Sequence, residues 1–186
     1  MYGTVNRAIE DMVVMHHGEP IRVDIKAEDD LDVYMFIGSE NHPNETTYRL
    51  VGATSTVLDV PTEQVLIGFG EHWVTHSAQA TFGGLMQATG KALPEPLRDL
   101  PDFHAQVALI FPDLHPLRFE CSEITDGALK LHCYSRRHGP TPFVVGLLPG
   151  PGKMFKPPVT VHLVDAKIDR ADHDVLDMKW QTELMI

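Results

Sequence analysis

The sequence predicts an α+β protein: a helical N-terminal lobe followed by a four-stranded antiparallel sheet that carries one inserted helix. Two patterns support this prediction. Apolar residues recur at helical spacing through the first two-thirds of the chain, whereas the last third holds short alternating runs separated by turn residues. A run of helices followed by a run of strands, without regular alternation, is typical of the α+β class.

The predicted helices begin near the N-terminus. Val5, Ile9 and Val13 are spaced one turn apart, and Gly18 ends this first helix. Residues 19–40 are mixed and acidic, so we expect a short helix and a loop there. The N-terminal half of the lobe is therefore expected to pack through the apolar face of its first helix.

Two further helices follow in this lobe. We expect Asn44 to cap a helix whose apolar residues include Tyr48. The next helix is expected over 61–74, with proline at its start. Gly68 and Gly70 weaken its middle and predict a point at which it can bend.

The middle of the chain predicts two more helices and then the sheet. A helix interrupted by prolines is expected over 82–99, and another over 100–111 carries His104. Asp126-Gly127 predicts a two-residue hairpin turn between the first two strands, and an apolar helix is expected over 141–148. The four predicted strands cover 117–122, 128–135, 159–164 and 175–180.

Length and charge exclude several classes of protein. The 186 residues fit one domain, 1–186, which we divide into a helical lobe over about 1–65 and a second lobe over about 66–186. No apolar run reaches the roughly 18–20 residues of a membrane span, and a signal-peptide pattern is missing. We therefore expect a cytoplasmic protein with no membrane partner. The net charge of −11 makes nucleic acid an unfavourable partner.

His104 lies on an apolar helix face beside Val107 and Phe111 at helical spacing. A buried imidazole without a partner costs about 1–3 kcal/mol, so something has to satisfy it. One interpretation is a core histidine bonded to a backbone carbonyl. The other is a metal ligand, and an apolar, flat pocket would suit a haem. Without a Cys-x-x-Cys-His motif, such a haem would be held non-covalently.

A second candidate site lies at the end of a predicted strand. Cys133, Ser135 and Arg137 share one face, while Tyr134 takes the other. A hydroxyl and a guanidinium together bind anions, including the two propionate carboxylates of a haem. A solvated strand end remains the alternative. A haem would explain both signals with one ligand.

The remaining motifs extend over almost the whole chain, from MYGTVN at 1–6 to ADHD at 171–174. The other segments are 47–53, 69–74, 100–107, 118–121, 134–137 and 144–148. In these residues the chain resembles the H-NOX family (haem nitric oxide/oxygen binding domains), which includes the sensor domain of soluble guanylate cyclase. The resemblance implies an α+β fold with haem between its two lobes.

The resemblance assigns haem-binding roles to particular residues. It makes His104 the proximal ligand of the iron in a non-covalent haem b. The family's propionate motif, Tyr-x-Ser-x-Arg, is represented here by Cys133, Ser135 and Arg137. A thiol is a weaker and shorter donor than the phenol it replaces. We therefore expect haem to be held less firmly than is typical of the family.

The resemblance also defines a distal pocket. Oxygen-binding members carry a tyrosine where this chain has Phe143, which cannot donate to bound dioxygen. The pocket therefore favours NO, and CO after it, over O₂. The other distal positions correspond to Val5, Ile9, Phe69 and Trp73. Outside the distal pocket, Leu117 stands where the family tends to carry a proline that presses on the haem.

The function that the resemblance implies is sensing rather than catalysis. NO at ferrous haem would release His104, and the length leaves no room for an output domain. The signal would pass to a separate histidine kinase or diguanylate cyclase. One alternative is a haem-poor or apo module of the same fold that binds a small ligand or a protein. Another is a metal-dependent enzyme built on His173 and its two aspartate neighbours. A third is a redox role for Cys121 and Cys133.

Overall fold

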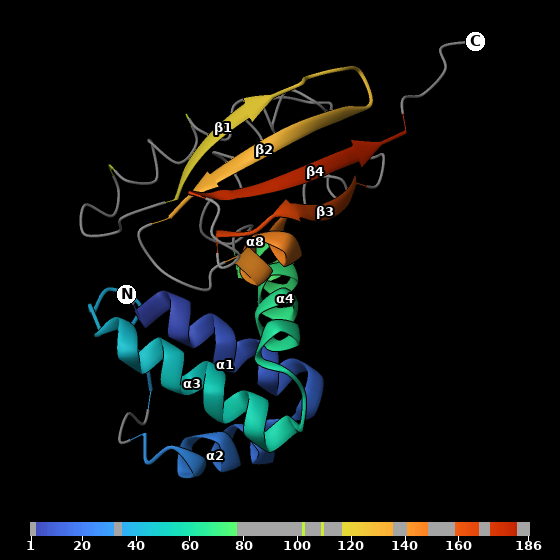
Figure 1. The fold of residues 1–186 in the computed structure, drawn as a ribbon. Helices are drawn as coiled ribbons and strands as arrows, with labels where there is room; N and C mark the ends of the chain where they lie inside the picture. The colour runs from blue at the N-terminus through green and yellow to red at the C-terminus, as the bar shows by residue number, and fades with distance from the viewer. Residues whose placement is uncertain are drawn as a thin grey trace.

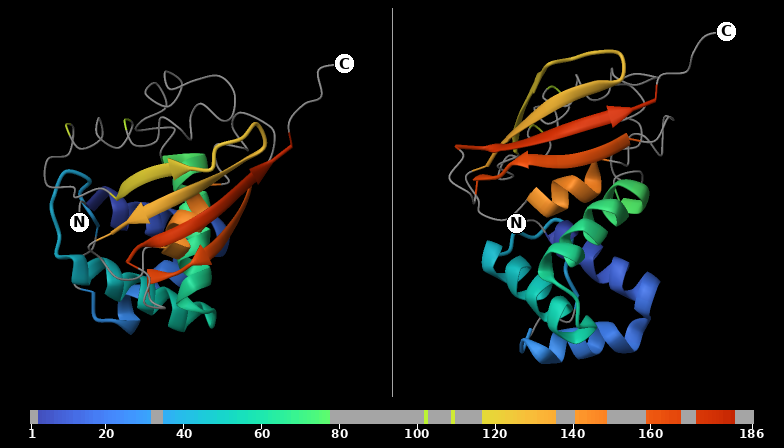
Figure 2. Two further views of the ribbon diagram at one scale, coloured as in Figure 1. Left: turned by 45° about the horizontal axis from the view of Figure 1, so that its top comes forward. Right: turned by 45° about the vertical axis from the view of Figure 1, so that its right-hand side comes forward.

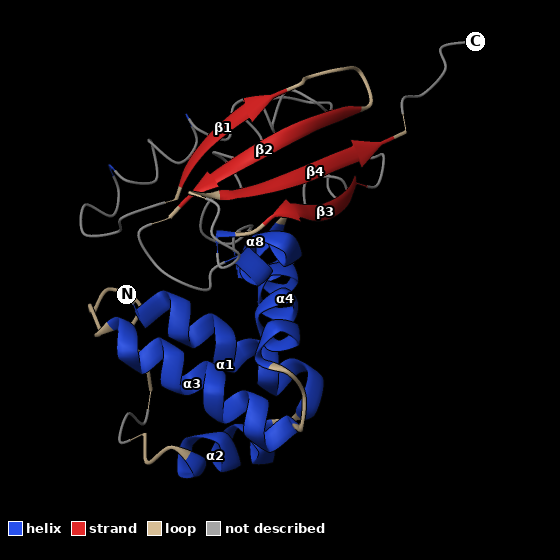
Figure 3. Ribbon diagram, viewed as in Figure 1, coloured by secondary structure: helices blue, strands red, loops and turns tan. Residues whose placement is uncertain are grey.

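The helical part of the molecule and the sheet lie at opposite ends, with two helices between them (Figures 1 and 3). This arrangement confirms the predicted α+β class and the predicted order of helices and strands. The computed structural model describes residues 3–31, 35–77, 102, 109, 117–135, 141–148, 159–167 and 172–181. The predicted helix over 82–99 and the helix segment around His104 lie outside these residues.

The helical end is built from three helices that pack on one another. Ile9, Leu50 and Val65 are buried in its core, as the apolar spacing predicts. A fourth helix leaves this group towards the sheet and changes into a π turn. The elements are α1 (Gly3–His17), α2 (Glu19–Glu28), α3 (Asn44–Leu58), α4 (Thr62–His72) and the π turn η1 (Trp73–Ser77).

Two details of α3 differ from the prediction. Asn44 is the first helical residue and not the cap, because Pro43 takes the capping position without a side-chain hydrogen bond. Tyr48 is 47% exposed, so it does not belong to the buried face of the helix. Its ring is amphipathic and is stable at the edge of a helix face, where the pattern alone does not separate it from the core.

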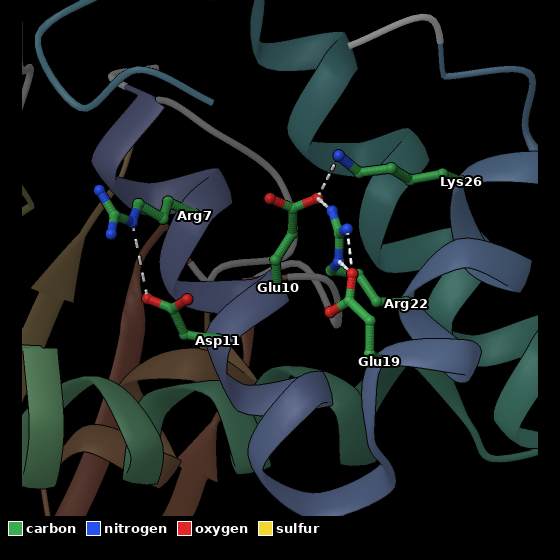
Figure 4. Close-up of polar contacts among 6 residues, drawn as sticks. All are labelled: Arg7, Glu10, Asp11, Glu19, Arg22 and Lys26. Atoms are coloured by element: carbon green, nitrogen blue, oxygen red, sulfur yellow. Dashed lines mark hydrogen bonds and ion pairs between the residues drawn. The ribbon is translucent and has the colours of Figure 1, made fainter. Parts of the chain in front are cut away.

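An ion-pair group joins α1 to α2 (Figure 4). The Glu10 side chain lies on the buried face of α1 and is only 6% exposed. Its Oε1 atom lies 2.6 Å from Lys26 Nζ and 3.5 Å from Arg22 Nη1, both on α2. Arg22 also pairs with Glu19. A carboxylate buried to this extent needs such partners, so the two cations fix how α2 lies against α1.

The sheet contains four antiparallel strands in the order β1-β2-β4-β3. Leu131, Leu176 and Met178 are fully buried on the face that turns towards α8. Figure 2 shows α8 and α4 side by side beneath this sheet. The elements are β1 (Arg118–Ser122), β2 (Ala128–Tyr134), α8 (Thr141–Leu147), β3 (Val159–Asp165) and β4 (Asp174–Trp180).

The turn between β1 and β2 is longer than predicted. A hairpin forms, but its loop spans the five residues 123–127 instead of two. Thr125 closes the loop through hydrogen bonds to Ala128. The carbonyl of Gly127 accepts from the backbone N–H of Trp180, so it pairs with β4. This contact across the sheet is not visible in the local sequence.

The glycines of α4 serve a different purpose from the predicted bend. The helix is continuous through Gly68 and Gly70. At Gly70 a Cβ atom would lie 2.2 Å from the carbonyl oxygen of Phe143, and at Gly146 it would lie 2.0 Å from that of Ile67. The backbones of α4 and α8 therefore touch, and only glycine permits this approach. The helical end and the sheet meet through this contact.

Among the described residues, no helix is long and apolar enough to cross a membrane.

Candidate functional site

Five of the residues predicted for the distal pocket gather where α1, α4, η1 and α8 meet. Ile9 and Phe69 lie in the buried core of the helical end, and Val5, Trp73 and Phe143 pack against it half-buried. The Phe69 ring centroid lies 4.9 Å from that of Phe143 and 5.9 Å from that of Trp73. Four separate elements thus contribute to one uncharged, largely aromatic group.

Phe143 connects this group to the sheet. It packs against the apolar cluster of the helical end and also against the cluster beneath the sheet. Leu117 and Cys133 belong to the second cluster. The described candidates from the distal side and the two from the sheet side therefore form one continuous apolar set. The ring of Phe143 thus connects residues that lie more than a hundred positions apart in the sequence, such as Ile9 and Cys133.

Cys133 lies on the inner face of β2 and is 3% exposed. Its strand partners are Phe119 on β1 and Asp174 on β4. Burial raises the pKa of the Cys133 thiol far above its ordinary value, and the Asp174 carboxylate and Cys121 add to this effect. The group is therefore a neutral thiol, which is a weak donor and an unreactive nucleophile.

The outer face of β2 carries Tyr134, as the predicted alternation requires. Its ring stacks on His173 with centroids 4.3 Å apart, and its hydroxyl donates to Glu120 Oε2 at 3.2 Å. Tyr134 therefore cannot take the role of the tyrosine missing from position 133. The carbonyl of Ser135 accepts from Lys167 Nζ at 2.6 Å. Two other predicted site residues, His104 and Arg137, lie outside the described residues.

The residues of the alternative enzyme site do not converge. His173 pairs with Asp172 and, through Nε2, with Nδ1 of His132 at 2.8 Å. Asp174 turns away and accepts from the Thr141 hydroxyl at 2.7 Å. Within the described ranges, no three His, Cys, Asp or Glu side chains are placed to hold one metal ion.

Neither cysteine of the alternative redox site is part of a disulfide. Cys133 lies opposite Phe119, and Cys121 lies opposite Leu131, so the thiols are offset by two residues along the hairpin. They face the same side of the sheet and are not joined by a disulfide. Because a thiolate is the reactive form, the neutral Cys133 does not support exchange chemistry in this conformation.

The described candidates fit a haem on the distal side. A flat, apolar group needs uncharged walls from several directions, and α1, α4, η1 and α8 supply them. On the sheet side the fit is partial. Cys133 offers a hydrophobic surface and only a weak donor to a propionate.

Two features of the structure were not predicted from the sequence. The burial of Glu10 was not predicted, because it depends on Lys26 and Arg22 of the following helix. The contact between Gly70 and α8 was not predicted either, since Gly70 was interpreted as a bending point and Gly146 only as part of a family motif. Two glycines on separate helices are the available signal for close backbone contact, but their pairing depends on the tertiary fold.

A family model described as "Haem-NO-binding" matches residues 2–163, most of the chain. Among curated proteins, soluble guanylate cyclase gcy-31 of Caenorhabditis elegans is 22% identical over 170 residues, which cover 91% of this chain. The match covers 24% of the worm protein, so this chain spans about a quarter of the length of that relative.

Solved structures show the same fold. The Fe(II) unliganded H-NOX protein from K. algicida superposes with a TM-score of 0.86 at 22% identity, covering 100% of both chains. The H-NOX protein from S. oneidensis in the Fe(II)NO ligation state gives a TM-score of 0.86 at 17% identity, covering 98% of this chain and 100% of that one.

Proposed function

The chain belongs to the Haem-NO-binding family, whose members are haem-based gas sensors, and we propose that its signal is nitric oxide at ferrous haem b. In this proposal the release of His104 from the iron starts the response. The observation that carries the proposal is the uncharged set of side chains joined through Phe143. Bound haem would supply the iron at which a diatomic gas binds.

The distal residues favour NO over O₂. Bound dioxygen is stabilised by a hydrogen-bond donor, whereas NO binds ferrous haem strongly without one. Val5, Ile9, Phe69 and Phe143 have no side-chain donor, which leaves the indole N–H of Trp73. CO, which also binds without a donor, is the expected second ligand.

The proximal and propionate roles rest on the family pattern. His104 would hold the iron through an imidazole nitrogen, and Ser135 and Arg137 would bind the propionates. Leu117 and Cys133 lie in the apolar cluster beneath the sheet and would contact the haem edge. The thiol adds little to haem affinity, because it is neutral and a weak donor.

The contact between α4 and α8 offers a route for the response. Because Gly70 and Gly146 bring the two backbones into contact, displacement of one helix has to move the other. Release of His104 would shift the helical end against the sheet through this contact. We propose a separate histidine kinase or diguanylate cyclase as the receiver of the signal. The cytoplasm is the proposed location, where cysteines that form no disulfide remain reduced.

Electron paramagnetic resonance of the ferrous protein with NO tests the release step. In the proposed state, the hyperfine pattern shows the NO nitrogen alone, without coupling to the His104 imidazole. A persistent imidazole coupling at saturating NO would contradict release. The same spectrum with nitrogen-15-labelled NO is the control, because the label changes the NO coupling and leaves any imidazole coupling unchanged.

Phe143→Tyr tests the basis of gas selectivity. A phenol at this position would give the distal pocket a donor, so O₂ affinity should rise by about 1 kcal/mol, or several-fold. NO binding should change little. The measurement is O₂ titration of ferrous protein by visible absorption, with Phe36→Tyr, in the core of the helical end, as the matched control. Equal O₂ affinity in the Phe143 variant and wild type would remove Phe143 as the selectivity determinant.

A haem-poor module of the same fold is the second candidate, and the buried neutral thiol at Cys133 favours it. Protein produced with ample haem but without a Soret band would support this candidate and exclude the sensor.

A further inference from the structure

A cavity of about 380 Å³ opens among the C-terminal turn of α1, the end of α3, the length of α4 and η1. It is separate from the candidate haem site, because none of the residues proposed for haem lines it. Four histidines line it, from α1, α4 and η1. They are His16, His17, His72 and His76.

His72 is the fixed member of this group. It is 4% exposed, and its Nδ1 atom has no hydrogen-bond partner. A buried nitrogen without a hydrogen-bond partner is destabilising, so native proteins rarely keep one without a ligand, an ion or a water. Burial, with the nearby His76 and His16, lowers the pKa of His72. The imidazole is therefore neutral, so one of its two nitrogens keeps a lone pair, and the residue lines the cavity.

Two exposed histidines lie next to it. The His76 ring stacks on the His72 ring with centroids 4.6 Å apart, and the His16 ring centroid lies 6.3 Å from that of His72. His72 and His76 are four residues apart on one continuous helical segment, a spacing that places two imidazoles on one face. Glu71 lines the same cavity, so the surroundings favour a cation over an anion.

We propose that this cavity binds a divalent transition-metal ion of the zinc class, with His72, His76 and His16 as its ligands. Neutral imidazole nitrogens are preferred ligands of such ions, and three of them leave a position for water or Glu71. As the side chains lie, no three such groups in the described ranges converge on one point. Binding therefore includes rotation of the exposed His16 and His76 rings towards the fixed His72.

Zinc binding to the purified haem-loaded protein tests the proposal. Equilibrium dialysis against Zn²⁺, followed by elemental analysis, counts zinc and iron per chain in the same sample. We expect one zinc per chain in the wild type. His16→Gln and His76→Gln should each weaken zinc binding about tenfold or more. Both residues are exposed, so these variants keep the fold, which circular dichroism verifies.

His162→Gln is the matched control, because it removes an exposed histidine on β3 that does not line the cavity. Its zinc affinity should equal that of the wild type. The proposal is overturned if the wild type binds no zinc, or if His162→Gln weakens binding as much as His76→Gln does. Loss of iron with retained zinc would count against the haem assignment alone, so the two failures are distinguishable.

Discussion

At the scale of single residues, Phe143 and Cys133 are the main described members of the proposed haem site. The ring of Phe143 joins the two apolar clusters, and the thiol of Cys133 occupies the position where a stronger donor is expected. Alternation along the strand predicted that Cys133 points inwards and Tyr134 outwards, and the structure confirms both. The unpaired Nδ1 of His72 was not predictable, because its burial depends on residues of a distant helix.

Cys133→Ser tests whether this position contacts the haem edge. A hydroxyl is a stronger donor than a thiol, so haem should dissociate more slowly, by a factor that corresponds to about 1 kcal/mol. The measurement is haem transfer to an acceptor globin, followed by absorption. Cys121→Ser on the neighbouring strand is the control and should leave the rate unchanged. If the rate of haem dissociation were unchanged in Cys133→Ser, Cys133 would be a core residue that does not contact the haem.

The raised pKa of Cys133 also predicts alkaline instability. The unfolded thiol has its ordinary pKa near 9.0, and the folded one lies above it. The stabilising contribution is therefore complete below pH 9 and is lost as the pH rises towards the folded-state pKa. Urea unfolding at pH 8 and pH 10 should show this loss in the wild type. The part of the loss due to Cys133 should disappear in Cys133→Ser, and an equal loss in both proteins would contradict this origin.

At the scale of elements, local sequence patterns predicted most helices and strands but not their contacts. The hairpin between β1 and β2 was predicted from its alternating strands. Its five-residue loop was not, because Gly127 bonds to Trp180 of a strand some fifty positions away. The same limit applies to Gly70, whose neighbour on α8 is set by the tertiary fold. Local sequence patterns therefore predict helices and strands, but they do not predict which of these elements contact one another.

Gly146→Ala tests the contact between α4 and α8. The new methyl group would lie 2.0 Å from the carbonyl oxygen of Ile67, so the helices have to separate. Overpacking of this kind costs about 1–3 kcal/mol, which urea unfolding would detect. Gly52→Ala is the matched control on α3, where nothing lies within 4 Å. There the same change should stabilise the helix by up to about 1 kcal/mol.

Gly146→Ala should also change the response to NO, because the proposed shift passes through this contact. The effect of NO on proteolysis or hydrogen exchange of α4 should be smaller than in the wild type. If Gly146→Ala is as stable as Gly52→Ala, the close approach of the two helices is wrong.

Glu10→Gln tests the ion-pair group between α1 and α2. Removing the charge leaves Lys26 and Arg22 without their buried partner, although both cations are partly solvated. After allowance for that solvation, we expect a loss of about 1–3 kcal/mol in the free energy of unfolding. Glu19→Gln removes an exposed partner of the same Arg22 and should have no measurable effect. If Glu10→Gln and Glu19→Gln lowered the free energy of unfolding equally, burial of Glu10 would not be the reason for its contribution.

At the scale of the whole molecule, the predicted fold class and the order of the elements are confirmed. They could be predicted because the hydrophobic period changes from helical to alternating near residue 117. The family was identified from motifs spread along the chain, and the family model matches residues 2–163. The functional roles of His104 and Arg137 remain predictions from that resemblance.

The visible absorption spectrum of ferrous protein, produced with ample haem and exposed to NO, tests whether the chain is a haem-based NO sensor. We expect a Soret band whose intensity corresponds to about one haem per chain, a clear shift of this band with NO, and no stable O₂ complex. In His104→Ala the proposed proximal ligand is lost, so the spectrum of the NO-free protein should change. A wild-type protein without a Soret band, or a His104→Ala spectrum identical to that of the wild type, would contradict this function.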